Sequence, residues 1–327
     1  MMRICLLGAG ATGGHFAVKL ARAGHDVSVV ARGAQLEAIE RNGLRLLAGE
    51  EELNARVQAT ARAGTLGTQD LVIVTVKTTA LASIAEGLEA LVGNQTAVVF
   101  PQNGMGWWYP IGLPAGRPAP PALPIFQLAD HFNRFLRIDQ ILPGAIYSAN
   151  EVVAPGVVRN TSPGHNALLV GALSPGQEDR LARLRHALDA AGIASADITD
   201  VRLAMWGKLL VNMSGSIIAL VTENKSSISR TDPALAAIHF RANAEGLEIA
   251  RAHGYALEGT VDPLKIRAGL PDHKPSILQD YERRRPMEIG EIIEAPLAFA
   301  RAAAVATPTL DTLAAIAIRR ARDRGLY

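Results

Sequence analysis

Two kinds of hydrophobic pattern alternate along about the first hundred residues. Short apolar runs rich in β-branched residues occur at 3–9, 26–31, 71–77 and 96–104. Between these runs, apolar residues recur at helical spacing in the segments 15–24, 35–43 and 79–93. Strands that are apolar along their whole length, alternating with helices, are typical of a parallel sheet covered on both faces. The sequence therefore predicts an α/β domain at the start of the chain.

The rest of the chain changes character twice. Residues 107–124 are rich in proline, which forbids regular structure there. One helix is predicted at 127–138, and β-rich runs separated by Pro-Gly turns at 145–171 indicate antiparallel strands. Beyond these runs the pattern is helical almost to the end of the sequence. We therefore predict two domains, a Rossmann-type domain over residues 1–174 and a mostly helical domain over residues 175–327.

Composition excludes several classes of function. The 327 residues carry a formal net charge of +2, and no basic arm or stripe indicates nucleic-acid binding. The eight histidines lack metal-ligand spacing, so we expect no metal. The one cysteine, Cys5, lies in an apolar run, which indicates a buried thiol in a reducing compartment. Because no apolar segment of about 18 residues is free of charge, we expect a cytoplasmic, soluble protein without a membrane span.

A glycine-rich motif joins the first predicted strand to the first predicted helix. The motif consists of Gly8, Ala9, Gly10, Ala11, Thr12 and Gly13. In this context the first glycine allows a tight turn, the second lets the backbone approach a pyrophosphate, and the third lets helix and strand pack closely. Free N–H groups at the helix start favour an anion. The motif therefore predicts a dinucleotide site; the alternative is a glycine-rich turn without a ligand.

Two basic residues at strand ends bear on which dinucleotide binds. NAD-specific sites usually place an acidic residue at the end of the second strand, on the ribose 2′-hydroxyl. Here Arg32 follows that strand and no acid is present. Because a guanidinium can bind a 2′-phosphate through two hydrogen bonds, we predict NADPH; the alternative is an ordinary surface arginine. Lys77 ends the strand 71–77, at the edge where open α/β sheets bind ligands, and is a second candidate.

A polar stripe runs along the predicted helix at 206–220. Lys208, Asn212 and Ser216 are four residues apart, so on an α-helix they lie along one side, next to an apolar face. The stripe is either solvated or the polar wall of a site. Reduction of a carbonyl requires a proton donor for the oxygen and polar groups that hold the substrate. A helical lysine with an amide beside it could supply both.

Three more polar residues could complete such a site. Asn103 ends the strand 96–104, Ser276 lies at an expected helix start, and Glu288 lies further along the same region as Ser276. A glutamate near a lysine keeps the lysine charged or tunes its pKa. Taken singly, each has an ordinary explanation: an asparagine is often a helix cap, and a glutamate is often one half of a surface ion pair.

In this order, the motifs resemble the ketopantoate reductase family (2-dehydropantoate 2-reductases) over nearly the whole chain. The shared segments are GAGATGG at 8–14, VK at 76–77, PQNGMG at 101–106, KLLVN at 208–212, KPSILQD at 274–280 and RRPMEI at 284–289. The resemblance implies a Rossmann domain followed by a helical domain, with an active site in the cleft between them. It also implies reduction of ketopantoate to pantoate with NADPH, in pantothenate and coenzyme A biosynthesis. A homodimer is left open.

The resemblance also implies a role for each candidate. Lys208 would be the general acid, and Glu288 would bind the substrate hydroxyl and help to position the lysine. The residues expected at the substrate are Asn103, Asn212, Ser216 and Ser276. Those expected at the cofactor are the glycine-rich motif, Arg32, Lys77, Asn103 and Glu288.

The sequence departs from the family pattern at three places. Ser216 stands where members usually have asparagine, and Gly290 stands where aspartate is common. The segment 107–124 replaces a short polar link, and it begins with two tryptophans and a tyrosine. It could form a lid over the site or a packed surface loop. These departures leave two alternatives open: a reductase of another branched or aromatic 2-oxo acid, or a non-catalytic NADP(H)-binding sensor.

Overall fold

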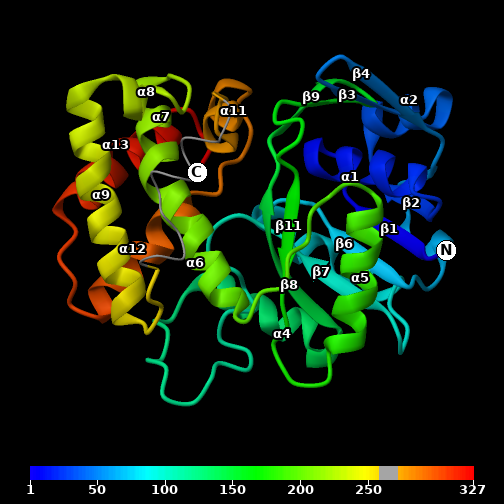
Figure 1. Cartoon of the computed structure of the whole chain (residues 1–327), viewed down its shortest axis with the longest axis horizontal. Coiled ribbons are helices and arrows are strands. Elements are labelled where there is room, and N and C mark those ends of the chain that lie inside the picture. The colour runs from blue at the N-terminus through cyan, green and yellow to red at the C-terminus, as the bar shows by residue number, and fades with distance from the viewer. Residues whose placement is uncertain (258–271) are drawn as a thin grey trace. The chain divides into compact units, whose positions relative to one another are not determined.

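A seven-stranded sheet organises the amino-terminal part of the chain (Figure 1). The computed structural model describes residues 1–257 and 272–327. In spatial order the strands are β11, β8, β7, β6, β1, β2 and β5, and every neighbouring pair is parallel except β11 with β8. Their bounds are β1 Arg3–Leu7, β2 Asp26–Val30, β5 Gln58–Thr60, β6 Leu71–Val74, β7 Ala97–Phe100, β8 Ile141–Tyr147 and β11 Ala167–Val170.

The order of the strands defines a switch point. From β1 the chain continues outward through β2 to β5, then returns to β6 on the other side of β1. In open α/β sheets, ligands bind outside the carboxyl ends of the strands at such a point. The four apolar runs predicted as strands are confirmed as β1, β2, β6 and β7, and with them the Rossmann-type architecture.

Helices cover this sheet where the apolar period predicted them, with two exceptions. Helix α1 (Ala11–Arg22) and helix α2 (Gly33–Asn42) are close to the prediction. The segment expected to be one helix at 79–93 is instead a series of short turns, ending in α3 (Ala85–Glu89). Gly87 lies inside α3, and glycine weakens a helix interior. The helix expected at 127–138 is only α4 (Leu128–Phe132).

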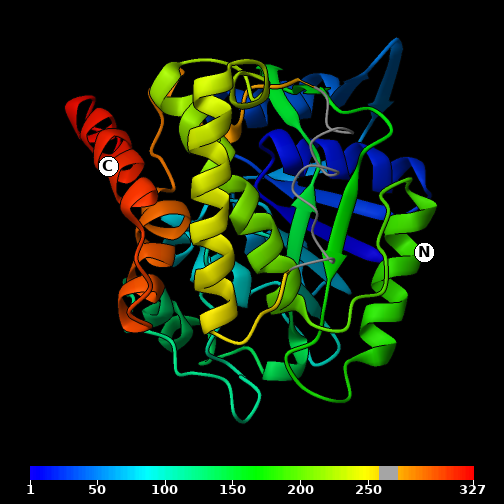
Figure 2. The ribbon, with the colours of Figure 1, turned by 60° about the vertical axis from the view of Figure 1, so that its left-hand side comes forward.

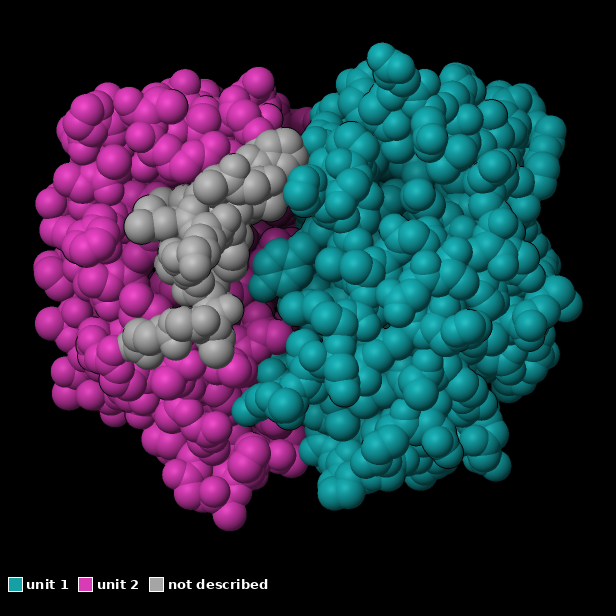
Figure 3. Space-filling view, in the orientation of Figure 1, with its two compact units in different colours: residues 1–102, 128–201 teal, residues 103–127, 202–327 magenta. Residues whose placement is uncertain are grey.

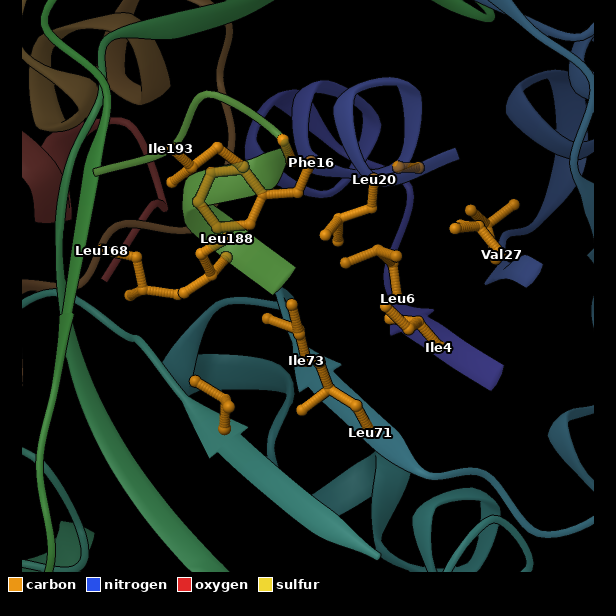
Figure 4. Packing of buried hydrophobic residues seen from close by; sticks show 14 of the residues in the cluster. Ile4, Leu6, Phe16, Leu20, Val27, Leu71, Ile73, Leu168, Leu188 and Ile193 are labelled. Atoms are coloured by element: carbon orange, nitrogen blue, oxygen red, sulfur yellow. The ribbon is translucent and has the colours of Figure 1, made fainter. Parts of the chain in front are cut away.

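The core of this part lies between the sheet and two helices, α1 and α5 (Glu178–Ala190). Figure 4 shows Leu20 of α1 directed toward Leu6 of β1, and the ring of Phe16 of α1 directed toward Leu188 of α5 in the same cluster. Cys5 is fully buried in β1, as predicted, and burial raises the pKa of its thiol to about 12. The thiol therefore stays protonated and unreactive at neutral pH.

A second, smaller sheet was predicted only in part. Its spatial order is β4 (Glu51–Ala55), β3 (Leu44–Ala48), β10 (Val157–Asn160) and β9 (Asn150–Ala154). The antiparallel pairs β9–β10 and β8–β11 confirm the expectation for residues 145–171. The hairpin β3–β4 and the parallel pairing of β10 with β3 were not predicted.

The chain divides into two compact units that differ from the expected domains (Figure 3). The first unit holds residues 1–102 and 128–201, and the second holds residues 103–127 and 202–327. The expected boundary at 174/175 would detach α5, which packs against α1 and β11 of the first unit. The described part of the second unit is mostly helical, as predicted. Its helical elements are α6 (Val201–Val211), η6 (Asn212–Ser216), α7 (Ile217–Thr222), α8 (Ile228–Thr231), α9 (Pro233–Ala252), α11 (Ser276–Glu282), η7 (Gly290–Glu294), α12 (Ala295–Ala302) and α13 (Pro308–Asp323).

The aromatic residues that open the proline-rich segment belong to the core of the second unit. Trp107, Trp108 and Tyr109 are 1%, 3% and 1% exposed. The ring of Tyr109 packs edge-on against Trp206 and Phe299, at centroid distances of 6.4 and 5.2 Å. These three aromatic side chains therefore belong to the core of the second unit and do not form a lid over a site.

One helical stretch in the described residues, Val201–Thr222, is long and apolar enough to cross a membrane by length and composition alone. About two thirds of its most apolar window (67%) is buried inside the protein. Such burial is what the core helix of a soluble protein shows.

Candidate functional site

The glycine-rich motif occupies the turn between β1 and α1, at the switch point of the first sheet. Gly8 has a φ of +115°, which a residue with a side chain rarely adopts. A Cβ on Gly13 would overlap the Gly8 carbonyl oxygen and lie 2.5 Å from Thr75 Oγ1. Both positions therefore require glycine for the close approach of helix and strand, as the motif predicts.

A Cβ on Gly10 would lie in open space, whereas a Cβ on Gly13 would overlap other atoms of the protein. It is the N-cap residue of α1 with a φ of −74°, and nothing lies within 4 Å of the position its Cβ would take. The first turn of α1 contains no acidic residue. A helix N-terminus with open space beside its N-cap residue and no acid in its first turn suits an anion such as a pyrophosphate. The residues present therefore fit a dinucleotide.

Two polar side chains that the sequence did not single out hold this turn. Thr75 Oγ1 donates to the Gly8 carbonyl oxygen at 2.6 Å. Gln35 Nε2 donates to the Ala9 carbonyl oxygen at 2.7 Å, and Gln35 Oε1 accepts from the Gly156 N–H at 3.0 Å. Thr75 could have been identified from the sequence, because it lies near the end of the predicted strand 71–77, where ligands bind. No sequence feature indicated a role for Gln35.

The two basic candidates of the first unit also follow parallel strands. Arg32 is exposed, comes directly after β2 and its neighbour Ala31, and is the N-cap residue of α2, whose first turn has no acid. Lys77 is partly buried and lies three residues beyond the end of β6. Since β1, β2 and β6 are parallel and adjacent, the motif, Arg32 and Lys77 all lie at the carboxyl edge of one sheet.

Lys208 lies in the last turn of α6 in the second unit and is partly buried. Burial lowers the pKa of its amine from 10.5 to about 8. The desolvated ammonium is a stronger acid than a surface lysine, and it is still protonated at neutral pH. Such a group can donate a proton to a developing alkoxide.

The polar stripe does not continue as a regular α-helix. Beyond Val211 the hydrogen bonds adopt the π pattern, over η6. The simple stacking of Lys208, Asn212 and Ser216 on one side of an α-helix was therefore wrong in detail, because a π-turn changes the angular spacing of the residues it contains. Asn212 is 9% exposed and Ser216 is half-buried.

The other candidates lie on elements that contact η6. It packs against α9, α11 and η7. Ser276 is the first residue of α11, after Pro275, and is exposed. Glu288 is 6% exposed and lies two residues before η7, where its carbonyl oxygen accepts from the Ile292 N–H at 3.1 Å.

The residues that follow Asn103 contact η7, the element beside Glu288. Gly104 has a φ of +80°, and a Cβ there would lie 2.7 Å from the backbone carbon and Cβ of Glu291. The Met105 N–H donates to the Glu291 carbonyl oxygen at 2.9 Å. The backbone beside Asn103 is thus docked on η7. All six candidates for substrate binding and proton donation lie in the second unit, whereas the motif, Arg32 and Lys77 lie in the first.

Among residues 1–257 and 272–327, no three His, Cys, Asp or Glu side chains are grouped so that they could hold a metal ion.

Several known proteins are similar to this chain in sequence and in fold. The family model described as ketopantoate reductase PanE/ApbA matches residues 4–111, and its C-terminal counterpart matches residues 200–321. A 2-dehydropantoate 2-reductase of Mesorhizobium japonicum is 35% identical over the full length of both chains. The crystal structure of a PanE/ApbA family ketopantoate reductase from Ralstonia eutropha JMP134 is 26% identical and has a TM-score of 0.80, with 99% of each chain covered. D-mandelate dehydrogenase, solved with NADH and anilino(oxo)acetate, shares the fold at a TM-score of 0.84 and 19% identity, over the whole of both chains.

Proposed function

The chain belongs to the ketopantoate reductase PanE/ApbA family, a family of dinucleotide-dependent oxidoreductases, and we propose that it reduces 2-dehydropantoate to pantoate with NADPH. The name of the Mesorhizobium japonicum relative supports this substrate. The role in pantothenate and coenzyme A biosynthesis and a cytoplasmic location are part of the proposal. The homodimer stays a prediction.

One observation supports the proposal most strongly. Burial lowers the pKa of the Lys208 amine to about 8. Lys208 lies next to a π-turn that packs against the segments of Ser276 and Glu288. In the proposed reaction the Lys208 ammonium gives a proton to the oxygen of the 2-oxo group. Glu288 accepts a hydrogen bond from the substrate hydroxyl and keeps Lys208 oriented.

The remaining polar candidates bind the substrate in this proposal. The amides of Asn103 and Asn212 and the hydroxyl of Ser216 donate to the oxygens of the 2-oxo acid. Ser276, at the start of α11, holds its carboxylate, because a helix N-terminus favours an anion. Asn103 and Glu288 also contact the cofactor.

The cofactor residues of the proposal are those at the carboxyl edge of the first sheet. The N–H groups of the glycine-rich motif bind the pyrophosphate, Arg32 binds the 2′-phosphate, and Lys77 binds a ribose or phosphate oxygen. The bound nicotinamide supplies the hydride that the 2-oxo carbon receives. The exposed guanidinium of Arg32, with no acid in the first turn of α2, supports NADPH over NADH.

The experiment compares two lysine variants of the second unit. Lys208→Ala should lower kcat by roughly 10²–10⁴-fold, the range for loss of a general acid, and leave the affinity for NADPH nearly unchanged. Lys225→Ala is the control, because Lys225 is an exposed lysine of the same unit, with 58% of its side chain accessible. Unaltered kcat in Lys208→Ala would remove Lys208 from the mechanism.

A bulkier 2-oxo acid is the second candidate substrate. Ser216 offers a short side chain on η6, and the similarly folded D-mandelate dehydrogenase was solved with anilino(oxo)acetate, a ligand with an aromatic ring. Comparison of kcat/KM for ketopantoate and for branched and aromatic 2-oxo acids distinguishes the two. If no 2-oxo acid leads to NADPH oxidation, the non-catalytic sensor replaces both.

A further inference from the structure

The helix that carries Lys208 changes its hydrogen-bonding pattern just where the proposed substrate residues begin. Helix α6 ends at Val211, η6 follows as one π-turn, and α7 resumes the α-helical pattern at Ile217. Single π-turns inside α-helices are rare and are frequent at functional sites. Asn212 and Ser216 are the first and last residues of this turn.

Ser214, the central residue of η6, is fully buried and has two acceptors. Its Oγ lies 2.8 Å from the carbonyl oxygen of Leu210 and 2.8 Å from Oδ1 of Asn243 on α9. The one hydroxyl hydrogen is therefore shared between the two acceptors. A serine that bonds the carbonyl four residues earlier competes with the backbone N–H for that carbonyl and bends the helix. Here the competition falls at the point where the backbone leaves the α pattern.

Helix α9 is close enough to take part because of a glycine. A Cβ on Gly246 would lie 2.6 Å from Leu210 Cδ1 and 2.7 Å from Met213 Cε. The missing side chain lets α9 pack closely against η6 and against Leu210 at the end of α6 (Figures 1 and 2). Asn243, one turn earlier on α9 and 9% exposed, can then reach Ser214.

We propose that Ser214 and Asn243 are positioning residues that hold η6 as a π-turn and thereby set where Asn212 and Ser216 lie relative to Lys208. This inference rests on the proposed function. Neither residue touches the substrate; both act through η6. Their loss should therefore impair binding of the 2-oxo acid and leave binding of NADPH unchanged, because the proposed cofactor residues lie mostly in the first unit and none of them lies on η6.

Three variants test the pair: Ser214→Ala, Asn243→Leu and the double variant. Ser214→Ala leaves the Asn243 amide oxygen without the serine hydrogen bond, and Asn243→Leu leaves the Ser214 hydroxyl with the Leu210 carbonyl as its one acceptor. The double change removes both polar groups. We expect KM for the preferred 2-oxo acid to rise about 10- to 100-fold in all three, the scale of effect for a small displacement of binding groups. KM for NADPH should not change. The double variant should regain the melting temperature of the wild type but not its KM.

Two controls separate positioning from general damage. Thr222→Val removes a hydroxyl that donates to the Ile218 carbonyl oxygen at 2.7 Å, the same kind of bond on α7, outside the π-turn, so its KM should equal that of the wild type. Ser214→Thr keeps the hydroxyl and should retain most of the substrate affinity, and it also serves if Ser214→Ala does not fold.

The outcomes distinguish this inference from the proposed function. Wild-type turnover with an unchanged KM in Ser214→Ala would overturn the positioning role alone. A double variant that regains both stability and KM would reduce the pair to a packing contact and would also overturn it. A wild-type protein that turns over no 2-oxo acid would remove the proposed function, and the inference with it.

Discussion

Lys208 connects the physical chemistry of one residue to the proposed reaction. Its side chain is partly buried on α6, and desolvation holds the pKa of its amine at about 8. A proton donor must be protonated before it can act, so in the proposed reaction the rate of reduction would depend on the fraction of Lys208 that carries the proton.

The pH dependence of turnover is the first prediction at this scale. We expect kcat for reduction to be level below pH 8 and to fall as pH rises through about 8, because Lys208 loses its proton there. A pH profile of kcat at saturating NADPH measures this. A rate that stays level to about two units above that value would contradict proton donation by Lys208.

Stability gives a second prediction that does not depend on activity. The folded-state pKa of Lys208, about 8, lies below the ordinary value of 10.5, so between these values the unfolded chain binds more protons and stability rises with pH. Lys208→Met should therefore melt at a higher temperature than the wild type at pH 7, and the difference should shrink between pH 8 and 10.5. Equal melting temperatures at every pH would mean that the amine is well solvated.

In the proposed function, Arg32 determines the preference for NADPH over NADH. Arg32→Glu should weaken NADPH much more than NADH, because the variant removes a partner of the 2′-phosphate and adds a like charge. The control is Arg41→Glu, the same charge change at an exposed residue of α2, roughly 14 Å further along the helix. Titration of both variants with both cofactors measures the effect. Equal weakening of NADPH and NADH by Arg32→Glu would mean that Arg32 is not at the 2′-phosphate.

At the scale of elements, two glycines of the glycine-rich turn differ in role: Gly13 is required by the packing of the protein, whereas Gly10 is proposed to leave space for a ligand. Gly10→Ala should leave the melting temperature unchanged, because the backbone at Gly10 suits alanine and its Cβ meets nothing within 4 Å. KM for NADPH should rise by about tenfold or more, because the Cβ would occupy space that the pyrophosphate needs. Gly87→Ala, which meets only Ala63 Cβ at 3.5 Å, is the control. Unchanged affinity in Gly10→Ala would contradict the proposed position of the pyrophosphate.

The sequence was informative about elements whose residues form a local pattern. β1, β2, β6 and β7 are apolar runs beside glycine or polar turns, and the motif after β1 depends on spacing alone. The hairpin β3–β4 contains three consecutive glutamates, Glu50, Glu51 and Glu52. Because these charged residues obscure the apolar pattern of the strands, the hairpin was not predicted.

The π-turn and the buried aromatic residues could not be predicted for a different reason. Apolar spacing over 206–220 fits an α-helix, and η6 becomes visible only through Ser214, whose partner Asn243 is 29 residues away. Trp107 and Trp108 follow the PQNGMG motif, and only tertiary packing shows that they serve the core rather than a lid.

At the scale of the whole molecule, neither compact unit is one continuous stretch of the sequence. Residues 103–127 interrupt the first unit in the sequence and belong to the second. Residues 175–201, expected in the second domain, belong to the first unit. Helix α5 contributes Leu181, Leu184 and Leu188 to the core of the first unit. The division into compact units therefore differs from the domain boundary expected from the sequence.

This division predicts which fragment folds. A fragment of residues 1–201, with 103–127 replaced by a flexible Gly/Ser linker, should fold and bind NADPH without reducing any 2-oxo acid. The same fragment ending at residue 174 lacks α5 and should be unfolded, because the apolar face of the sheet loses its cover. Circular dichroism and cofactor titration compare the two. A stable, NADPH-binding fragment that ends at 174 would restore the boundary expected from the sequence.

The most direct test of the account is the oxidation of NADPH by the purified protein with ketopantoate, next to branched and aromatic 2-oxo acids, with the 2-hydroxy acid product identified by mass spectrometry. The account predicts turnover that requires a 2-oxo acid, prefers NADPH to NADH, is highest for ketopantoate and is lost in Lys208→Ala. Absence of turnover with every 2-oxo acid, with NADPH bound, would contradict it.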